Sequence, residues 1–313
     1  DAYEHANVNP RTIELLEAHG TGTKVGDAVE AEALSAVYRE AEATGSWCAI
    51  GSVKSMIGHT KAAAGVAGLI KIAMALKYKV LPPTIKVEQP LEILQAGQAP
   101  VYVNATKRPW ISGGAHPRRA ALSAFGFGGS NFHCVLEEVE SEKAEIEWDG
   151  QVLLFGFSGN EIAELTLKLG KTDHEKAWDE LRCDAARSLQ SYDISQPYRL
   201  TLVVTKETKL EKLIKGVNSM FTQHADKKSW STPDSAYFAS GKPVGHLAML
   251  FPGQGSQYTN MLVDLACQFP QMQGVLAEAQ HVFSEHHGGQ GLNDLVYPVA
   301  AFTDEAKAED ENK

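Results

Sequence analysis

Several features that would assign the sequence to a common class are scarce or missing. Four cysteines occur in 313 residues, and they stand far apart with no CxxC pair: Cys48, Cys134, Cys183 and Cys267. This spacing argues against a metal cluster and against a disulfide framework. Phosphate-binding motifs are missing too, because no G-x-x-x-x-G-K-[ST] occurs and no G-x-G-x-x-G follows a strand. We therefore expect no metal, no bound nucleotide and a reducing, cytoplasmic location.

An excess of positive charge and a long apolar run are also lacking. The chain has 29 lysines and arginines and 39 aspartates and glutamates, which gives a formal net charge of -10. A general nucleic-acid binder would carry a basic stripe instead. The most apolar stretch, residues 62–76, contains Lys71 and two glycines and is shorter than a membrane span needs. We expect no nucleic-acid partner, no signal peptide and no membrane span, and we interpret this stretch as a buried helix.

The sequence does contain alternating strand and helix patterns. In the first part, strands are predicted at residues 13–18, 49–53, 101–104, 120–124 and 132–139, and helices at 27–43 and 62–78. In the second part, strands are predicted at 152–157 and 199–205, helices at 160–170, 174–190 and 207–222, a polar connector at 227–245 and a strand at 246–251. These patterns predict the α/β fold class. Polar stretches divide the chain into predicted domains 1–140, 141–245 and 246–313.

Two glycine-bracketed histidines stand after predicted strands. His19 lies in "EAHGTGT", and Lys54 and His59 lie in "GSVKSMIGHTKAAAG". Neighbouring strands could bring both imidazoles to one point, where neutral rings donate hydrogen bonds to a developing oxyanion or enolate. Lys54 could tune their protonation. Taken singly, each has a structural alternative: His19 ends a buried strand, Lys54 is a surface cation and His59 is a polar residue at a helix start.

Two further glycine-rich turns offer weaker signals. In "FGFGGSN", Phe125 and Phe127 could gate a pocket, or the segment is only a tight turn, and His133 is interpreted as structural. In "FPGQGSQY", backbone amides and the side chain of Gln254 could donate to an oxyanion. The alternative for that segment is a plain strand-to-helix connection.

Together these motifs resemble one family in order and spacing. The segments "EAHGTGTKVGDAVEAEAL", "GSVKSMIGHTKAAAGVAGLIK", "LPPTIKVEQP" and "FGFGGSNFHCVLEE" are similar to the C-terminal half of β-ketoacyl synthases of the polyketide and multidomain fatty-acid type. "AMLFPGQGSQY" resembles the start of a malonyl/acyl-CoA:ACP transacylase, and the stretch between resembles the linker of such proteins. The amino-acid sequence of residues 8–30 is most similar to that of bacterial polyunsaturated (omega-3) fatty-acid synthases.

The resemblance implies a fold and an activity. The fold is a thiolase-like layered α/β/α half-domain, then a small α+β linker domain, then the first strand and helices of an α/β transacylase. The activity is decarboxylative Claisen condensation of malonyl-ACP with a cysteine-bound acyl thioester, followed by transacylase loading of malonyl or acyl units.

The resemblance also assigns roles to residues. His19 and His59 donate to the malonyl thioester oxygen, Lys54 is the family lysine and Glu30 is the carboxylate that pairs with it. Thr21 and Thr23 contact the phosphopantetheine arm, Phe127 is the gating phenylalanine and Gln254 is the transacylase oxyanion-hole glutamine.

The sequence departs from the family pattern at both nucleophiles. No cysteine has the expected small-residue context, and no GHSxG serine occurs. The chain begins at Asp1 without methionine and ends in a charged "DEAKAEDENK". We expect a piece of a longer protein that is inactive and folds poorly when isolated. Two alternatives remain open on the sequence alone: a non-catalytic partner resembling a chain-length factor, and a transacylase-centred protein with the synthase part as scaffold.

Partners also follow from the resemblance. They are an acyl carrier protein that brings the phosphopantetheine, a second copy in a homodimer and other synthase subunits, with malonyl-CoA or acyl-CoA as substrates and no directly bound cofactor. A basic cluster could dock the carrier protein or could be solvated surface charge: Lys107, Arg108, Arg118 and Arg119.

Overall fold

The computed structural model describes residues 1–41, 45–95, 99–139, 143, 151–242, 246, 248–286 and 291–303. The chain forms two compact units: Asp1–Ile146 together with Pro252–Lys313, and Glu147–Phe251. Each is described by itself. The division of the sequence into three domains stays a prediction, and the described residues between Pro252 and Thr303 belong to the first unit. No helix among the described residues is long and apolar enough to cross a membrane.

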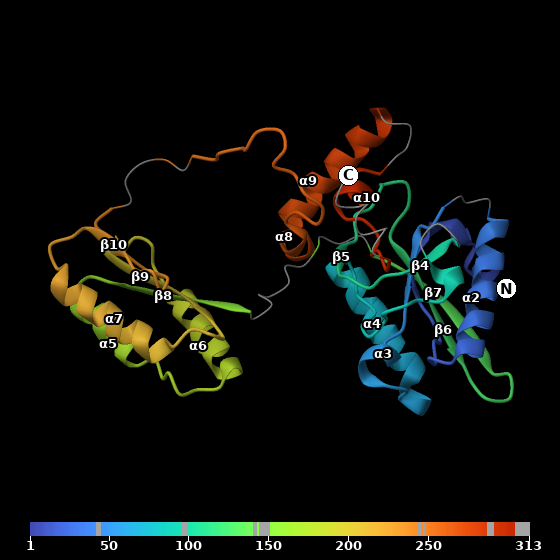
Figure 1. Cartoon of the computed structure of the whole chain (residues 1–313), viewed down its shortest axis with the longest axis horizontal. Coiled ribbons are helices and arrows are strands. Elements are labelled where there is room, and N and C mark those ends of the chain that lie inside the picture. The colour runs from blue at the N-terminus through green and yellow to red at the C-terminus, as the bar shows by residue number, and fades with distance from the viewer. Residues whose placement is uncertain are drawn as a thin grey trace. The chain divides into compact units, whose positions relative to one another are not determined.

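The first unit is built on a five-stranded sheet with the order β4-β2-β1-β6-β7 (Figure 1). Its strands are β1 (Ile13–Glu17), β2 (Cys48–Gly51), β4 (Val101–Val103), β6 (Arg119–Phe125) and β7 (Asn131–Glu137). β1 pairs in parallel with β2 and β6, β2 pairs in parallel with β4, and β7 runs antiparallel to β6. The apolar run of β1 is explained by its central place, since a parallel strand covered on both faces carries no alternation of polar residues.

Two long helices of this unit, α2 and α4, cover opposite faces of the sheet. Successive side chains of a strand point to opposite faces. Leu16 accordingly packs in a cluster with Tyr38 of α2 (Lys24–Glu40), and Leu15 packs in a cluster with Ile72 of α4 (Ala64–Tyr78). Figure 1 shows α2 and α4 on either side of the strands. The layered α/β class is therefore confirmed.

Several short elements and the long helix α9 complete the first unit. They are α1 (Ala2–Ala6), η1 (Pro10–Thr12), α3 (Lys54–Ile57), η2 (Lys61–Ala63), β3 (Val80–Leu81), η3 (Glu92–Leu94), β5 (Arg108–Pro109), α8 (Val263–Gln268), α9 (Pro270–His286) and α10 (Leu292–Val296). The last three helices bury Ala266, Leu276 and Tyr297 in a small cluster against Ile111. The Gln273 amide donates to the carbonyl of Lys79 at 2.6 Å.

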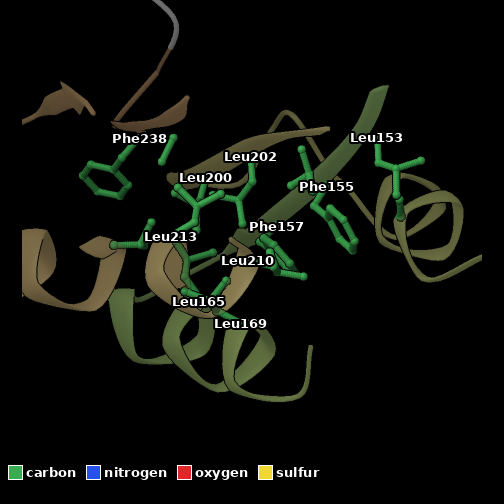
Figure 2. Packing of buried hydrophobic residues seen from close by; sticks show 14 of the residues in the cluster. Leu153, Phe155, Phe157, Leu165, Leu169, Leu200, Leu202, Leu210, Leu213 and Phe238 are labelled. Carbon is green, nitrogen blue, oxygen red and sulfur yellow. The ribbon is translucent and has the colours of Figure 1, made fainter. Parts of the chain in front are cut away.

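The second unit is an antiparallel sheet with the order β10-β11-β9-β8 and a single apolar core (Figure 2). Its elements are β8 (Val152–Gly159), α5 (Ile162–Gly170), α6 (Trp178–Gln190), β9 (Tyr198–Thr205), α7 (Leu210–Gln223), β10 (Ser229–Ser231) and β11 (Ala236–Ser240). Phe155 and Leu202 from the strands meet Leu165 and Leu213 from the helices. The edge strand β8 is covered by α6, where the Ser188 hydroxyl accepts the N–H of Gly156 at 3.0 Å.

Three details of the secondary-structure prediction are wrong. The helix predicted from 27 begins at Lys24, because Thr23 occupies the N-cap and Asp27 instead accepts the N–H of Gly22 at 3.3 Å. The connector predicted at 227–245 contains β10 and β11, whose alternating apolar residues face the core.

The third detail is the strand predicted at 246–251. Residues 248–251 form no strand, and residue 247 lies outside the described residues. Met249, Leu250 and Phe251 are 70%, 91% and 88% exposed. A strand needs a neighbour to satisfy its backbone groups, and none of the described strands pairs with this segment.

Candidate active site

The "EAHGTGT" segment forms a loop between β1 and α2 that a buried carboxylate holds in place. The two oxygens of Glu30, on α2, accept the N–H groups of His19 at 2.7 Å and Gly20 at 2.9 Å. Gly20 has a φ of +45°, and a Cβ there would lie 2.8 Å from the Cβ of Ser52. Glycine therefore lets this loop approach the residue that follows β2.

The backbone fixes the tautomer of His19. The N–H of Phe125, at the end of β6, donates to Nδ1 of His19 at 3.2 Å, and the two rings lie 5.4 Å apart. Since Nδ1 accepts, the proton of the neutral ring sits on Nε2. Burial, and then the positive charge of Lys54, lower the pKa of His19 from its ordinary value of 6.5. The ring is therefore a neutral Nε2–H donor at physiological pH.

His59 is arranged in the same way from the other side. The N–H of Lys61, at the start of η2, donates to Nδ1 of His59 at 3.1 Å, which leaves Nε2 to carry the proton. The ring centroids of His19 and His59 lie 5.6 Å apart at an interplanar angle of 81°. The structure thus brings together the two histidines that the sequence places forty residues apart.

Lys54 begins α3 beside this pair. Burial lowers its pKa, while Glu17, Glu30 and Asp27 raise it through their negative charges. The implied ion pair between Lys54 and Glu30 is wrong: it is not among the ion pairs of the described residues, and each oxygen of Glu30 accepts a backbone amide instead. The two groups influence each other only through the electrostatic field.

The sequence prediction missed one buried pair. Glu17, the last residue of β1, accepts a hydrogen bond from Nζ of Lys71 on α4 at 2.8 Å, and from the N–H of Val53 at 2.6 Å. A signal was present, because a glutamate ending an apolar strand and a lysine inside the most apolar stretch both need a partner when buried.

The other implied residues lie on exposed turns. Thr21 and Thr23 share a hydrogen bond between their hydroxyls at 3.1 Å. Phe127 protrudes fully from the turn between β6 and β7, whose Gly128 and Gly129 both have a φ of +88°. Gln254 lies in a separate exposed turn at residues 252–257. The loop, the two histidines and Lys54 form one cluster, and Gln254 is not part of it.

The basic cluster proposed for docking is not an exposed patch. Arg108 and Arg118 are buried, at 6% and 8% exposure. Every member has a carboxylate partner, in the pairs Lys107–Asp264, Arg108–Asp294, Arg118–Glu138 and Arg119–Glu137. Both interpretations of the cluster, as a docking patch and as solvated surface charge, are therefore wrong for the two buried arginines.

Two other observations bear on the chemistry. His133 is structural as predicted, since it lies between the hydroxyls of Ser123 at 3.0 Å and Tyr3 at 2.9 Å. No group of three His, Cys, Asp or Glu side chains suited to a metal ion occurs in the part of the chain that the structure describes.

The match to known protein families falls on this cluster. Residues 1–88 match the family described as beta-ketoacyl synthase, C-terminal domain. Residues 1–88 belong to the β-ketoacyl synthase family. This synthase segment contains β1, α2, β2, α3 and α4, and with them His19, Glu30, Lys54 and His59.

Relatives that match nearly all or part of the chain are large synthases. The chain is 34% identical over 325 residues to one of the polyunsaturated fatty acid synthase subunits of Thraustochytrium sp., a match that covers 95% of the chain and 12% of that protein. It is 48% identical over 143 residues to the polyketide synthase PksL of Bacillus subtilis, covering 46% of the chain and 3% of the relative. The chain thus spans about an eighth of the first relative and less of the second.

Solved ketosynthases are similar too. The ketosynthase from module 6 of the bacillaene synthase of Bacillus subtilis is 32% identical, with 76% of this chain and 39% of that one covered at a TM-score of 0.43. The α/β fold is established by the topology of the chain itself.

Proposed function

We propose that this chain contributes the decarboxylating half of a ketosynthase site in a multidomain fatty-acid or polyketide synthase. The observation that carries the proposal is the meeting of His19 and His59, both with Nδ1 blocked by a backbone amide. Two preorganised Nε2–H donors then lie on neighbouring rings, whose centroids are 5.6 Å apart. Such donors stabilise negative charge that develops on an oxygen atom.

The proposed reaction uses these donors on a malonyl thioester carried by an acyl carrier protein. The bond between the malonyl carboxylate and the central carbon breaks, carbon dioxide leaves, and the electron pair moves onto the thioester oxygen. His19 and His59 donate to that oxygen and so lower the barrier to decarboxylation. The enolate carbon then attacks an acyl thioester on a cysteine, and the cysteine sulfur leaves.

Lys54 and Glu30 have supporting roles in this proposal. Burial and then the charge of Lys54 lower the pKa of His19, so Lys54 helps to keep that ring in its neutral, donating form. Glu30 holds the backbone of the loop at His19 and Gly20. Neither residue needs to touch the substrate.

We assign the acyl-carrying cysteine to none of the four cysteines of the chain. Cys48 is fully buried, and burial raises its pKa. Burial also raises the pKa of Cys267, to about 11, and that of Cys134. A nucleophilic cysteine needs a lowered pKa and access to substrate.

The exposed turns are proposed to handle the substrate arm. The hydroxyls of Thr21 and Thr23 lie on the solvent side of the loop and suit contact with the amides of phosphopantetheine. Phe127 is 108% exposed at the tip of its turn, where it is free to move across the arm. The proposed partners are an acyl carrier protein, a second copy and other synthase subunits, with no cofactor bound directly.

A transacylase role is proposed for the segment that contains Gln254. Its amide side chain and the neighbouring backbone N–H groups would donate to an oxyanion when malonyl or acyl units are loaded. The domain division at residues 140 and 245 belongs to the same proposal.

The test replaces His19 or His59 by alanine in a synthase protein that contains residues 1–313, and measures carbon dioxide release from malonyl-loaded carrier protein. Loss of one oxyanion donor lowers kcat by about 10²–10³-fold. His5→Ala, at an exposed histidine on α1, is the matched control and keeps the parental rate. Decarboxylation near the parental rate in either active-site variant contradicts the proposal.

A further inference from the structure

A buried ion pair lies directly under the proposed site. The side chains of Glu17 and Lys71 are only 3% and 10% exposed, and their charged atoms lie 2.8 Å apart. Burying two charges costs several kcal/mol per ion before their attraction offsets it. Such a pair therefore needs additional hydrogen bonds, and Glu17 accepts one from the backbone of Val53.

The second oxygen of Glu17 holds the start of α3. It accepts the N–H of Val53 at 2.6 Å, and Val53 is the N-cap residue of α3 immediately before Lys54. One carboxylate thus connects the end of β1, the turn after β2 and the middle of α4. His19 follows the first of these segments by two residues, and His59 follows α3 by two residues.

Gly68 leaves room for this arrangement. A Cβ on Gly68 of α4 would lie 2.9 Å from Cγ of Glu17 and 2.7 Å from Cδ1 of Leu122. A side chain at residue 68 would therefore displace Glu17. A Cβ on Gly51, at the end of β2, would be in ordinary contact with Nζ of Lys71, at 3.4 Å, and would collide instead with Oγ1 of Thr84.

We propose that the Glu17–Lys71 pair is a positioning device that fixes the start of α3, and thereby sets Lys54 in place beside His19 and His59. Its catalytic consequence rests on the proposed function. Its structural and electrostatic consequences for Lys54 do not.

The charges around Lys54 allow the effect of the Glu17–Lys71 pair to be measured through the pKa of Lys54. The groups that act on Lys54 are Glu17 from β1, Glu30 and Asp27 from α2, and Lys71 from α4. Glu17 raises the pKa of Lys54 and Lys71 lowers it, while burial lowers it most. Removing Glu17 alone must therefore lower the pKa of Lys54 further, and removing Lys71 alone must raise it.

The experiment measures the rate at which an amine reagent labels Lys54 as a function of pH, by mass spectrometry of the folded chain. Glu17→Gln is expected to shift the titration of Lys54 to lower pH, and Lys71→Met to shift it to higher pH. Glu138→Gln is the matched control, because it disrupts another buried pair of the same unit, with Arg118, and leaves Lys54 unchanged. Shifts in the same direction in both variants, or none in either, overturn the proposal.

A double variant keeps the test decisive if a single variant fails to fold. Glu17→Gln with Lys71→Met removes both buried charges, a change that is often neutral for stability. The glutamine oxygen still accepts the N–H of Val53. The double variant is expected to titrate Lys54 closer to the parent than either single variant does, and a larger departure overturns the proposal.

Kinetics separate this inference from the proposed function. Each single variant leaves one buried charge without its partner, and the strain of that charge is expected to displace residue 17 or 71 and with it the start of α3. Displacement of a positioned group by about 1 Å costs about 10²-fold in rate, so each single variant is expected to lose about 10²-fold in kcat for decarboxylation with KM unchanged. The double variant recovers part of that loss. If the Lys54 titrations shift as expected while His19→Ala stays active, the positioning stands and the proposed function falls. If His19→Ala is inactive while kcat of Glu17→Gln equals the parental value, the positioning role falls alone.

Discussion

Two glycines of α4, three residues apart, should respond in opposite ways to the same substitution. Gly68→Ala places a methyl group 2.7 Å from Leu122 and 2.9 Å from Glu17, whereas Gly65→Ala places one at an ordinary 3.5 Å from Ala124. Leu122 and Glu17 are 7% and 2% exposed, so neither side chain can swing into solvent.

Magnitudes decide the sign of each change. Alanine is favoured over glycine in a helix interior by about 0.5–1 kcal/mol. Overpacking a well-filled core costs about 1–3 kcal/mol. Gly68→Ala is therefore expected to lower the free energy of unfolding by up to about 2.5 kcal/mol, the difference of these two terms. Gly65→Ala meets no such contact and is expected to raise it by about 0.5 kcal/mol, since the residue lies in the first turn.

The assay is urea denaturation of the parent and both variants. Unfolding is monitored through a spectroscopic signal from residues of the first unit. Equal stability of Gly68→Ala and Gly65→Ala would show that no crowding exists at Gly68. So would a loss of stability in Gly68→Ala while the Lys71–Glu17 hydrogen bond and Leu122 keep their parental NMR shifts.

Three further predictions concern burial. Leu169 is a fully buried residue of α5, and Leu169→Ala should destabilise the second unit by about 2–5 kcal/mol. Hydrogen exchange should become faster in α5 and stay unchanged in β1. Loss of protection in both units would contradict separate cores. Cys48 should resist iodoacetamide in the folded chain while exposed Cys183 is alkylated, and equal labelling would contradict the burial of Cys48. Burial raises the pKa of Glu30 from its ordinary 4.5, so its contribution to stability is fully present below that pH and is lost as pH rises through the raised value. The unfolding free energy of the parent minus that of Glu30→Gln should therefore fall from acid to neutral pH, and a difference that grows with pH would contradict the assignment.

Periodicity and turn chemistry were sufficient to predict most of the first sheet. The run around Leu15 and Leu16 predicts a buried strand, and both faces of that strand are covered. The predicted strand at 246–251 failed for the opposite reason, because an apolar run indicates burial without naming the neighbour that would bury it. The sequence of β10 and β11 is too polar to indicate two strands. These strands form because β11 pairs with β9 and β10 pairs with β11.

The histidines could be predicted from the sequence, but their tautomers could not. Their glycine-bracketed positions after neighbouring strands indicate a common site. Which ring nitrogen carries the proton depends on the N–H groups of Phe125 and Lys61, and the first of these is 106 residues from His19. The true role of Glu30 was hidden similarly, since its partners are backbone amides that have no sequence signature.

The central claim is that His19 and His59 both present an Nε2–H donor at neutral pH. Long-range proton–nitrogen NMR correlations of imidazole-labelled protein at about pH 7.5, above the ordinary pKa of histidine, measure this directly. His19→Ala and His59→Ala assign the signals. We predict an unprotonated Nδ1 and a protonated Nε2 on both rings. A protonated Nδ1 on either ring, or a doubly protonated ring at that pH, would contradict the account.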